Sequence, residues 1–350
     1  MNNLSSEKIS FTDLIVDVVD KDRCVACGAC EAACPVNVIK LDNFVPTLVG
    51  ECIECGICYS NCPRTDFDDD ALEETVYGRT RNEGEQLTGV YSEVYAARAI
   101  PSDIQERAQD GGIVTALLSQ FLEDGGDAVI VAGLDKERPW LPIPTVARTR
   151  DETVKAAGTK YTPSPTLVGL KKAVKEDKLE KVAVVGTPCQ MRGLTRLTDG
   201  PMKNIKYKNS VDLKVGLFCM ETFNHDSFIE YLSKNDVDPV KVTKFMIKNG
   251  RFYAQAGEER LHRARLKKVK SLIRSCCSQC DDFTSEYADI SVGNVGSPAG
   301  YSTVLVRTER GKKALESAIK AGIVEAGPIE DFEKGETLVH KLAEMKKGSH

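Results

Sequence analysis

The chain has 350 residues, of which 41% are hydrophobic and 28% charged, and its net charge is −5. This length predicts two or three domains, and the apolar fraction is high enough for hydrophobic cores and too high for a disordered chain. The mild acidity gives no indication of a nucleic-acid-binding protein, which would usually have an excess of basic residues.

The sequence also contains no membrane span. Its longest apolar runs, such as Ala128–Leu134, are far shorter than the about 20 residues that cross a bilayer. Met1–Asp20 has no basic region followed by an apolar stretch, so no secretory signal is visible. We therefore expect a cytoplasmic protein that reaches a membrane only through partner subunits. In a reducing cytosol, its 13 cysteines indicate metal ligation rather than disulfides.

The first cysteines form an internal repeat. Eight of the 13 lie between Cys24 and Cys62, and two stretches 28 residues apart both read C-x2-C-x2-C-x3-C-P. This pattern resembles the two-cluster ferredoxins over roughly Asp20–Thr65. Two-residue spacers let three thiolates surround one face of an iron–sulfur cube, while the fourth cysteine points away. The resemblance implies one 4Fe–4S cluster on Cys24, Cys27, Cys30 and Cys62 and a second on Cys52, Cys55, Cys58 and Cys34.

A pair of zinc knuckles is the alternative for this repeat. Zinc would need four ligands in a self-contained group, without the cysteine after the three-residue spacer and its following proline. After the repeat, Thr65–Gly84 opens with a run of acidic residues that is poor core material and indicates a joint. We expect a ferredoxin domain at 1–75, a linker at 76–87, a cofactor-binding domain at 88–325 and a C-terminal extension at 326–350.

The body alternates predicted strands and helices. Gly112–Leu122 and Gly311–Ala321 have helical periodicity, and a helical stretch begins at Gln190. The predicted strands are Tyr91–Ala99, Asp127–Ala132, Lys181–Gly186, Val211–Leu217, Ala288–Val292 and Thr303–Arg307. This alternation favours an α/β domain, with a sheet covered by helices on its faces.

Two loops are candidates for nucleotide binding. The chain has no G-x-G-x-x-G unit between a strand and a helix. The turn at Asp110, Gly111 and Gly112 opens a helix, where backbone amides attract phosphate, but it can equally be a simple glycine turn. Gly158–Tyr161 offers a cation and a ring to a dinucleotide, although such a sequence is also common in ordinary loops.

The remaining cysteines indicate a third cluster. Cys189 and Cys219 each follow a predicted strand, and strand ends meet at one edge of an α/β sheet. With the C-x2-C pair Cys277 and Cys280 they make four thiolates, enough for a 4Fe–4S cluster. Cys276 can replace Cys277 as a ligand. The alternative is a set of buried free cysteines that pack as small hydrophobes.

Several segments of the body carry a family resemblance. GGIVTALL, AAGTKY, VGTPCQ, GLFCMETF, CSQCDDF and ADISVGNVGSPAGYSTVLVRTERG occur in this order. Together they resemble the beta-subunit family of the coenzyme F420-reducing hydrogenase over about Thr88–Gly311. With a ferredoxin in front, the whole chain most closely resembles the electron-input subunit of the archaeal reduced-F420 dehydrogenase complex.

This resemblance implies cofactors and site residues. It implies FAD, a nearby 4Fe–4S cluster and a pocket for the deazaflavin coenzyme F420, so that the whole chain would hold three clusters. It places the third cluster on Cys189, Cys219, Cys277 and Cys280. It implies FAD contacts at Gly111, Gly112, Thr115, Lys160, Tyr161 and Thr187.

The expected function follows from these cofactors. The chain would oxidise reduced coenzyme F420 by hydride transfer to FAD and pass single electrons through the clusters to a ferredoxin or to subunits of a membrane-bound dehydrogenase. Hydride transfer needs positioning rather than an acid–base residue, and the histidines, including His225, form no catalytic constellation. The alternatives are a non-catalytic iron–sulfur electron-transfer subunit and a freestanding ferredoxin:F420 oxidoreductase.

A basic strip precedes the last cysteines. Coenzyme F420 has a phosphodiester and a polyglutamate tail, and FAD has a pyrophosphate, so a basic strip beside the redox centre can steer either anion. A solvated basic face and a docking face for a protein partner are the alternatives. The strip contains seven cations and no acid: Arg260, Arg263, Arg265, Lys267, Lys268, Lys270 and Arg274.

Overall fold

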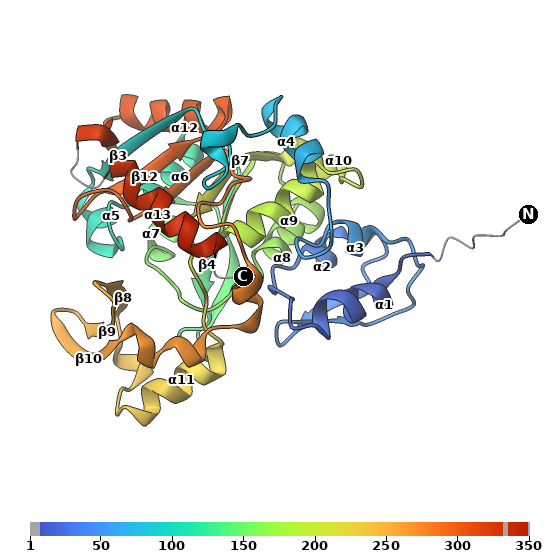
Figure 1. The fold of residues 1–350 in the computed structure, drawn as a ribbon, viewed down its shortest axis with the longest axis horizontal. Helices are drawn as coiled ribbons and strands as arrows, with labels where there is room; N and C mark the ends of the chain where they lie inside the picture. The colour runs from blue at the N-terminus through green and yellow to red at the C-terminus, as the bar shows by residue number, and fades with distance from the viewer. Residues whose placement is uncertain (1–7, 332–334, 349–350) are drawn as a thin grey trace, which may run out of the picture.

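The computed structural model describes residues 8–331 and 335–348. A ferredoxin unit lies against a larger body built on an eight-stranded sheet, and a three-stranded sheet forms a separate lobe of that body (Figure 1). Within the described residues, no helix combines the length and the apolar character needed to cross a membrane.

The ferredoxin unit repeats one local structure. The helices α2 (Ala29–Ala33) and α3 (Ile57–Ser60) both begin after a glycine with positive φ, Gly28 at 87° and Gly56 at 70°. Glycine is favoured there because side chains with a Cβ rarely adopt this conformation. The unit also contains the helix α1 and a two-stranded antiparallel hairpin: α1 (Phe11–Leu14), β1 (Ile39–Asp42) and β2 (Val45–Leu48).

The joint contains a folded helix, and most of its acidic side chains are exposed, as expected of poor core material. The helix α4 (Asp69–Tyr77) is capped by Asp68 and buries Glu73. The Glu73 carboxylate accepts hydrogen bonds from Arg81, whose guanidinium also lies 2.7 Å from a carboxylate oxygen of Glu286. Glu73 is the buried exception, because a buried carboxylate is tolerated where an arginine compensates its charge.

The body contains a mixed sheet with the strand order β13-β3-β12-β11-β7-β6-β4-β5. Its central strands β11, β7, β6 and β4 are parallel, and the outer pairs are antiparallel. The α/β prediction is confirmed, and each predicted strand is present with ends moved by one or two residues at most. The strands are β3 (Glu93–Ala99), β4 (Ala128–Leu134), β5 (Pro142–Ala147), β6 (Val182–Gly186), β7 (Val211–Leu217), β11 (Ile290–Gly293), β12 (Ser302–Val306) and β13 (Val324–Pro328).

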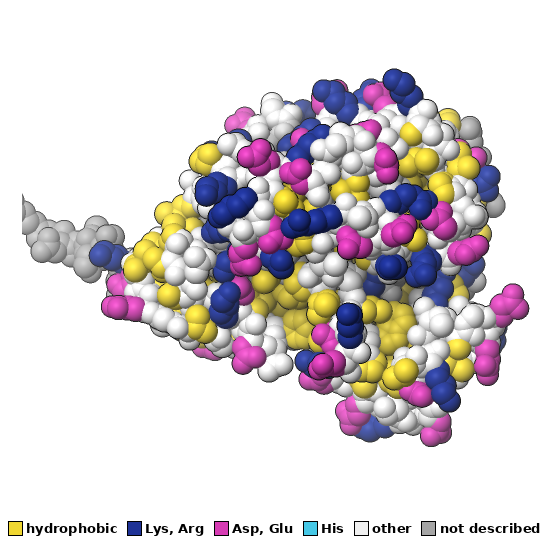
Figure 2. Space-filling view, turned by 180° about the vertical axis from the view of Figure 1, so that it is seen from behind, with side chains coloured by type: hydrophobic (Ala, Val, Ile, Leu, Met, Phe, Trp, Pro, Cys, Tyr) yellow, Lys and Arg dark blue, Asp and Glu magenta, His cyan; other side chains and the backbone are white. Residues whose placement is uncertain are grey.

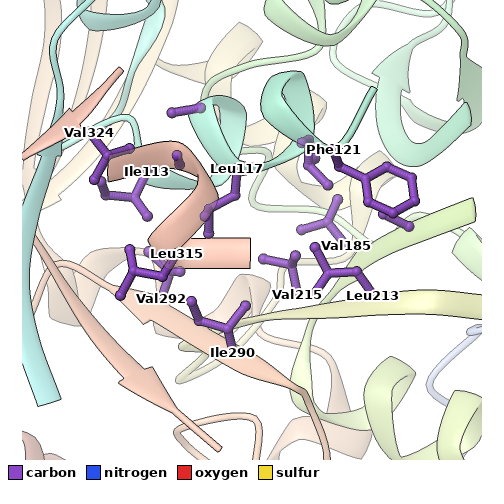
Figure 3. Packing of buried hydrophobic residues seen from close by; sticks show 14 of the residues in the cluster. Ile113, Leu117, Phe121, Val185, Leu213, Val215, Ile290, Val292, Leu315 and Val324 are labelled. Carbon is purple, nitrogen blue, oxygen red and sulfur yellow. The ribbon is translucent and has the colours of Figure 1, made fainter. Parts of the chain in front are cut away.

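Helices cover both faces of this sheet. On one face, Ile113 and Leu117 of α6 pack with Leu315 of α12 against Val215 and Ile290 of the sheet (Figure 3). The other face is covered by α8, α9 and α10, and its core continues into α2 of the ferredoxin unit. The helices are α5 (Ser102–Arg107), α6 (Ile113–Glu123), α7 (Arg150–Lys155), α8 (Thr166–Lys171), α9 (Pro188–Asp199), α10 (Ile205–Ser210) and α12 (Glu309–Lys320).

The lobe has an aromatic core of its own. The antiparallel strands β8 (Lys244–Lys248), β9 (Arg251–Ala256) and β10 (Glu259–Arg265) pack against α11 (His225–Lys234) through Phe228, Phe245 and Phe252. The last helix, α13 (Gly335–Lys347), returns to the body, where Lys346 donates hydrogen bonds to the carbonyls of Met220 and Cys277 at 2.6 and 2.8 Å.

Candidate iron–sulfur and flavin sites

Two cavities in the ferredoxin unit are lined by four cysteines each. The proximal cavity has apolar walls that include Leu14 and Val18. The distal cavity lies against Phe11. The last cysteine of each run therefore lines the cavity of the other run, the arrangement that the ferredoxin resemblance implies. The proximal cavity holds Cys24, Cys27, Cys30 and Cys62, and the distal cavity holds Cys34, Cys52, Cys55 and Cys58.

The later cysteines meet at the carboxyl edge of the parallel strands. Cys189 follows β6 and Cys219 follows β7, and these strands pair in parallel. Burial raises the pKa of the Cys219 thiol well above its usual value, and the nearby thiols of Cys277, Cys189 and Cys280 raise it further. We call Cys189, Cys219, Cys277 and Cys280 the third cysteine group.

These thiol sets suit a group that supplies positive charge. Burial, together with the neighbouring thiols, holds the pKa of Cys27 and Cys30 well above the usual value, since thiolates gathered in a buried site repel one another. Iron bound as a cluster would offset this repulsion and keep its ligands deprotonated. Within the described part of the chain, no three His, Cys, Asp or Glu side chains converge on a single-ion site.

Cys276 and Cys277 have different surroundings. Cys276 is only 2% exposed and packs in the core beneath the ferredoxin unit. Cys277 lies beside Thr222, with its Sγ 3.4 Å from the Thr222 backbone nitrogen. A hydrogen bond from the Cys276 thiol lowers the pKa of Cys277 and outweighs the opposing effect of burial, and hydrogen bonds from Thr222 lower it further.

Two predicted flavin contacts, the glycines that precede α6, have a packing role. A Cβ on Gly111 would lie 2.6 Å from the Ala97 carbonyl oxygen and from the Ser302 nitrogen, so the chain passes too close to the sheet for a side chain. Gly112 precedes α6 with φ 73°, and Thr115 is buried in the first turn. The glycine turn therefore has a structural reason that is independent of any nucleotide.

The other predicted flavin contacts lie near that turn and near the third cysteine group. Gly158 would bring a Cβ to 3.5 Å from the Arg107 carbonyl oxygen, so its loop adjoins the segment before the glycine turn. Burial lowers the pKa of Lys160, on the same loop, to about 8. Tyr161 stacks on Phe223 with ring centroids 5.9 Å apart. Thr187 Oγ1 lies 3.3 Å from Cys189 Sγ.

Some functional expectations change. Arg274 is not part of an exposed strip, since its guanidinium donates to the carbonyls of Cys24 and Val25 across the boundary with the ferredoxin unit. His225 is buried at the start of α11, with Nε2 3.1 Å from the Pro139 carbonyl oxygen. The sequence does not reveal that Arg64 and Arg196 donate hydrogen bonds across the boundary with the ferredoxin unit. The carbonyls that accept these bonds are distant in sequence and belong to no motif.

The chain matches known proteins along most of its length. Two models describe the beta subunit of coenzyme F420 hydrogenase/dehydrogenase: the model of its N-terminal part matches residues 94–171, and the model of its C-terminal part matches residues 179–332. A 4Fe-4S dicluster domain matches residues 16–81.

Individual relatives agree with these models. The coenzyme F420 hydrogenase beta subunit of Methanothermobacter thermautotrophicus is 40% identical over 75% of this chain and 93% of its own. The F(420)H(2) dehydrogenase of Methanosarcina mazei has a subunit that is 29% identical over 95% of this chain and 92% of its own. The solved F420-reducing [NiFe] hydrogenase complex of Methanosarcina barkeri contains a chain with a TM-score of 0.71 and 37% identity, over 75% of this chain and 91% of that one.

FAD and 4Fe–4S clusters are typical of such proteins. The chain belongs to the coenzyme F420 hydrogenase/dehydrogenase beta-subunit family, a family of F420-dependent oxidoreductases that transfer electrons through iron–sulfur clusters, and carries an N-terminal 4Fe–4S dicluster domain.

Proposed function

We propose that this protein oxidises reduced coenzyme F420 and passes the electrons one at a time to a ferredoxin or to another redox subunit. The observation that carries the proposal is the presence of three sets of four cysteines, two in the ferredoxin unit and one in the body. The set in the body, the third cysteine group, lies at the carboxyl edge of the sheet beside the predicted flavin loops. Bound FAD would accept a hydride as an electron pair and release single electrons.

The residue assignments belong to this proposal. The proximal, distal and third cysteine sets would hold three 4Fe–4S clusters, within domains bounded at 1–75, 88–325 and 326–350. The linker is then 76–87. The half-buried Lys160 and the ring of Tyr161 would orient FAD, together with Gly111, Gly112, Thr115 and Thr187.

The lobe supplies support for an anionic substrate. On one face of its sheet, Lys248 lies opposite Arg251, which lies opposite Arg265. Like charges at directly opposite positions destabilise a sheet, so an anion bound there would relieve a local cost. Among the described residues, none of these three cations pairs with a carboxylate. The basic face consists of Lys244, Lys248, Arg251, Arg260, Arg263 and Arg265.

This basic face lies towards the predicted flavin loops. Lys244 Nζ donates to the Ala108 carbonyl at 2.8 Å, two residues before the Asp110 turn. Figure 2 shows a hollow between the body and the lobe, with hydrophobic side chains in its floor and Lys and Arg at its margin. An apolar floor suits a deazaflavin ring, and basic side chains at the margin suit the anionic tail of coenzyme F420.

Stopped-flow spectroscopy of anaerobically purified protein tests the proposal. We expect reduced coenzyme F420 to bleach the bound flavin rapidly and NADH to do so poorly, because the chain lacks the glycine fingerprint of nicotinamide-binding folds. Equal reduction by NADH contradicts the assignment of the donor. Absence of any flavin bleaching favours instead a subunit that only conducts electrons.

A further inference from the structure

Two arginines cross the boundary between the ferredoxin unit and the body in opposite directions. Arg64 follows Cys62 of the proximal cavity by two residues, and it donates to the carbonyls of Cys276 and Gln279 at 2.7 Å each. Arg274 precedes Cys277 of the third cysteine group, and it donates to the carbonyls of Cys24 and Val25 at 2.9 and 3.1 Å. Each arginine therefore donates hydrogen bonds to the loop that carries the cysteines of the other site.

A third arginine strengthens the same boundary. Arg196 is fully buried on α9, the helix that begins beside Cys189. It donates to the carbonyls of Cys62 and Thr65, and its guanidinium lies 4.2 Å from the ring centroid of Phe67. Arg196 therefore ties α9 to the segment that follows Cys62, while Arg64 and Arg274 join the two cysteine loops directly.

Arg64 and Arg274 have cysteine thiols as neighbours: both lie near Cys24, and Arg64 also lies near Cys280. Across residues 8–331 and 335–348, neither Arg64 nor Arg274 nor Arg196 forms an ion pair with Asp or Glu. The guanidinium of Arg64 is instead held by the carbonyls of Cys276 and Gln279 on the loop of the third cysteine group. A buried cation without a counter-charge is costly, and cluster-bound thiolates would provide that charge.

We propose that Arg64 and Arg274 are positioning residues for electron transfer between the third site and the proximal site. The two guanidinium forks fix the distance between the cysteine loops. Their positive charge stabilises the reduced, more negative state of each adjacent cluster and so raises its reduction potential. One electron leaves the third site, which is oxidised by one electron, and the proximal site is reduced by one.

Redox titration of the holoprotein with dithionite, monitored by electron paramagnetic resonance, tests this proposal. In Arg64→Met and Arg274→Met we expect lower midpoint potentials at the proximal and third sites and a weaker magnetic interaction between them. A tenfold fall in the ratio of reduced to oxidised cluster at a fixed solution potential would correspond to a midpoint potential about 59 mV lower, for a one-electron couple. Arg64→Lys should leave the midpoint potentials close to those of the unaltered protein, because lysine retains the positive charge. It should still weaken the magnetic interaction between the two sites, because lysine lacks the planar fork.

Arg192→Met is the matched control. Arg192 is a largely buried arginine on α9, like Arg196, but it pairs with the carboxylate of Asp69 instead of with a carbonyl of a cysteine loop. We expect its potentials and its magnetic interaction to be those of the unaltered protein. Unchanged values in both Arg64→Met and Arg274→Met overturn the proposal, as does an equal change in Arg192→Met. The inference rests on clusters at these sites, as in the proposed function, but dithionite replaces coenzyme F420, so failure of the F420 assignment is detected separately.

Discussion

At the residue scale, the adjacent cysteines Cys276 and Cys277 have different surroundings, and we predict different roles for them. The thiol of Cys276 is buried in the core under α2, and its hydrogen bond to Cys277 together with burial raises its pKa strongly. Cys277 lies with the third cysteine group and has a lowered pKa. A low pKa favours the thiolate, which is the form that binds iron.

Alanine substitutions separate these roles. Cys277→Ala should reduce the iron content from about twelve to about eight atoms per chain, because a cube holds four irons. Cys276→Ala should retain about twelve and cost on the order of 1 kcal/mol of unfolding free energy for the lost buried sulfur. Anaerobic iron and sulfide analysis measures both variants. Loss of a cluster in Cys276→Ala alone would mean that the ligand assignment is wrong.

Lys160 predicts a pH dependence for flavin binding. Because burial lowers its pKa to about 8, the ammonium that would attract an anionic dinucleotide is lost as the pH rises above that value. We expect the dissociation constant of FAD from the apoprotein to rise by up to about tenfold per pH unit above pH 8. Fluorescence titration measures this constant.

As the pH rises above 8, the affinity for FAD should fall, whereas the stability of the ligand-free protein should increase. Between a pKa of about 8 in the folded chain and the ordinary value of 10.5, the unfolded chain binds more protons at Lys160, so this residue's contribution to stability rises with pH. Lys160→Met should bind FAD about 10- to 100-fold more weakly at pH 7, the effect of losing a charged hydrogen bond. Its affinity should be independent of pH, and a pH dependence that persists in this variant rules out Lys160 as its source.

At the element scale, the pairing of β8, β9 and β10 places basic residues from all three strands on one face of the lobe. Alternation along β9 and β10 puts Phe252 and Ala254 in the aromatic core and leaves Arg251 and Arg265 on the opposite face. The strip defined by sequence was incomplete, since strand pairing adds Lys244, Lys248 and Arg251 to the face. It also included Arg274, which belongs to the boundary with the ferredoxin unit.

Charge reversal tests the role of the basic face. Arg263→Glu combined with Arg265→Glu should raise the apparent KM for reduced coenzyme F420 about tenfold and change kcat little, because the face would act on substrate capture. The effect should fade with salt. A deazaflavin without the phosphodiester and polyglutamate tail is the control substrate, and its KM should not change.

Lys267→Glu combined with Lys268→Glu is the companion variant. These exposed lysines lie in the short turn after β10, beyond the paired strands. We expect a higher KM for this variant also, because both lysines belong to the basic strip. The increase should be smaller than for the double variant of Arg263 and Arg265. Steady-state kinetics at low and high salt compare the two. Unchanged KM values in both double variants would assign the cations to solvent or to a protein partner.

At the scale of the whole molecule, the ferredoxin unit shares its core with the body. Ala29 and Ala32 of α2 pack with Leu167 and Leu170 of α8 in one buried cluster. Tyr207 on α10 also donates a hydrogen bond to the Ala32 carbonyl at 3.0 Å. Separation of the two units would expose this apolar surface to water, so neither is stabilised independently of the other.

We therefore expect the protein to unfold in one cooperative transition. Far-ultraviolet circular dichroism and visible iron–sulfur absorbance should change at the same denaturant concentration, since the units unfold together. Ala32→Asp should lower that midpoint for both signals, because it buries a charge without a partner. The exposed substitution Glu54→Gln is the control and should lower neither. Two separate midpoints in the unaltered protein would show independent domains.

Local pattern determined much of this protein. The two cysteine repeats, the apolar strands such as Lys181–Gly186 and the ordered family segments predict the dicluster domain, the α/β sheet and the F420 family, and these predictions are confirmed. Each depends on residues close together in the chain, where spacing and periodicity act directly on ligation geometry and burial.

Tertiary structure decided the features that depend on distant partners. Glu73 of the acidic joint is buried where Arg81 approaches both it and Glu286, and the basic face exists because β8, β9 and β10 pair in a particular register. Arg64 and Arg274 have no recognisable motif, because their carbonyl partners lie more than 200 residues away in sequence. Every residue has a carbonyl, so only folding determines which carbonyls a buried arginine reaches.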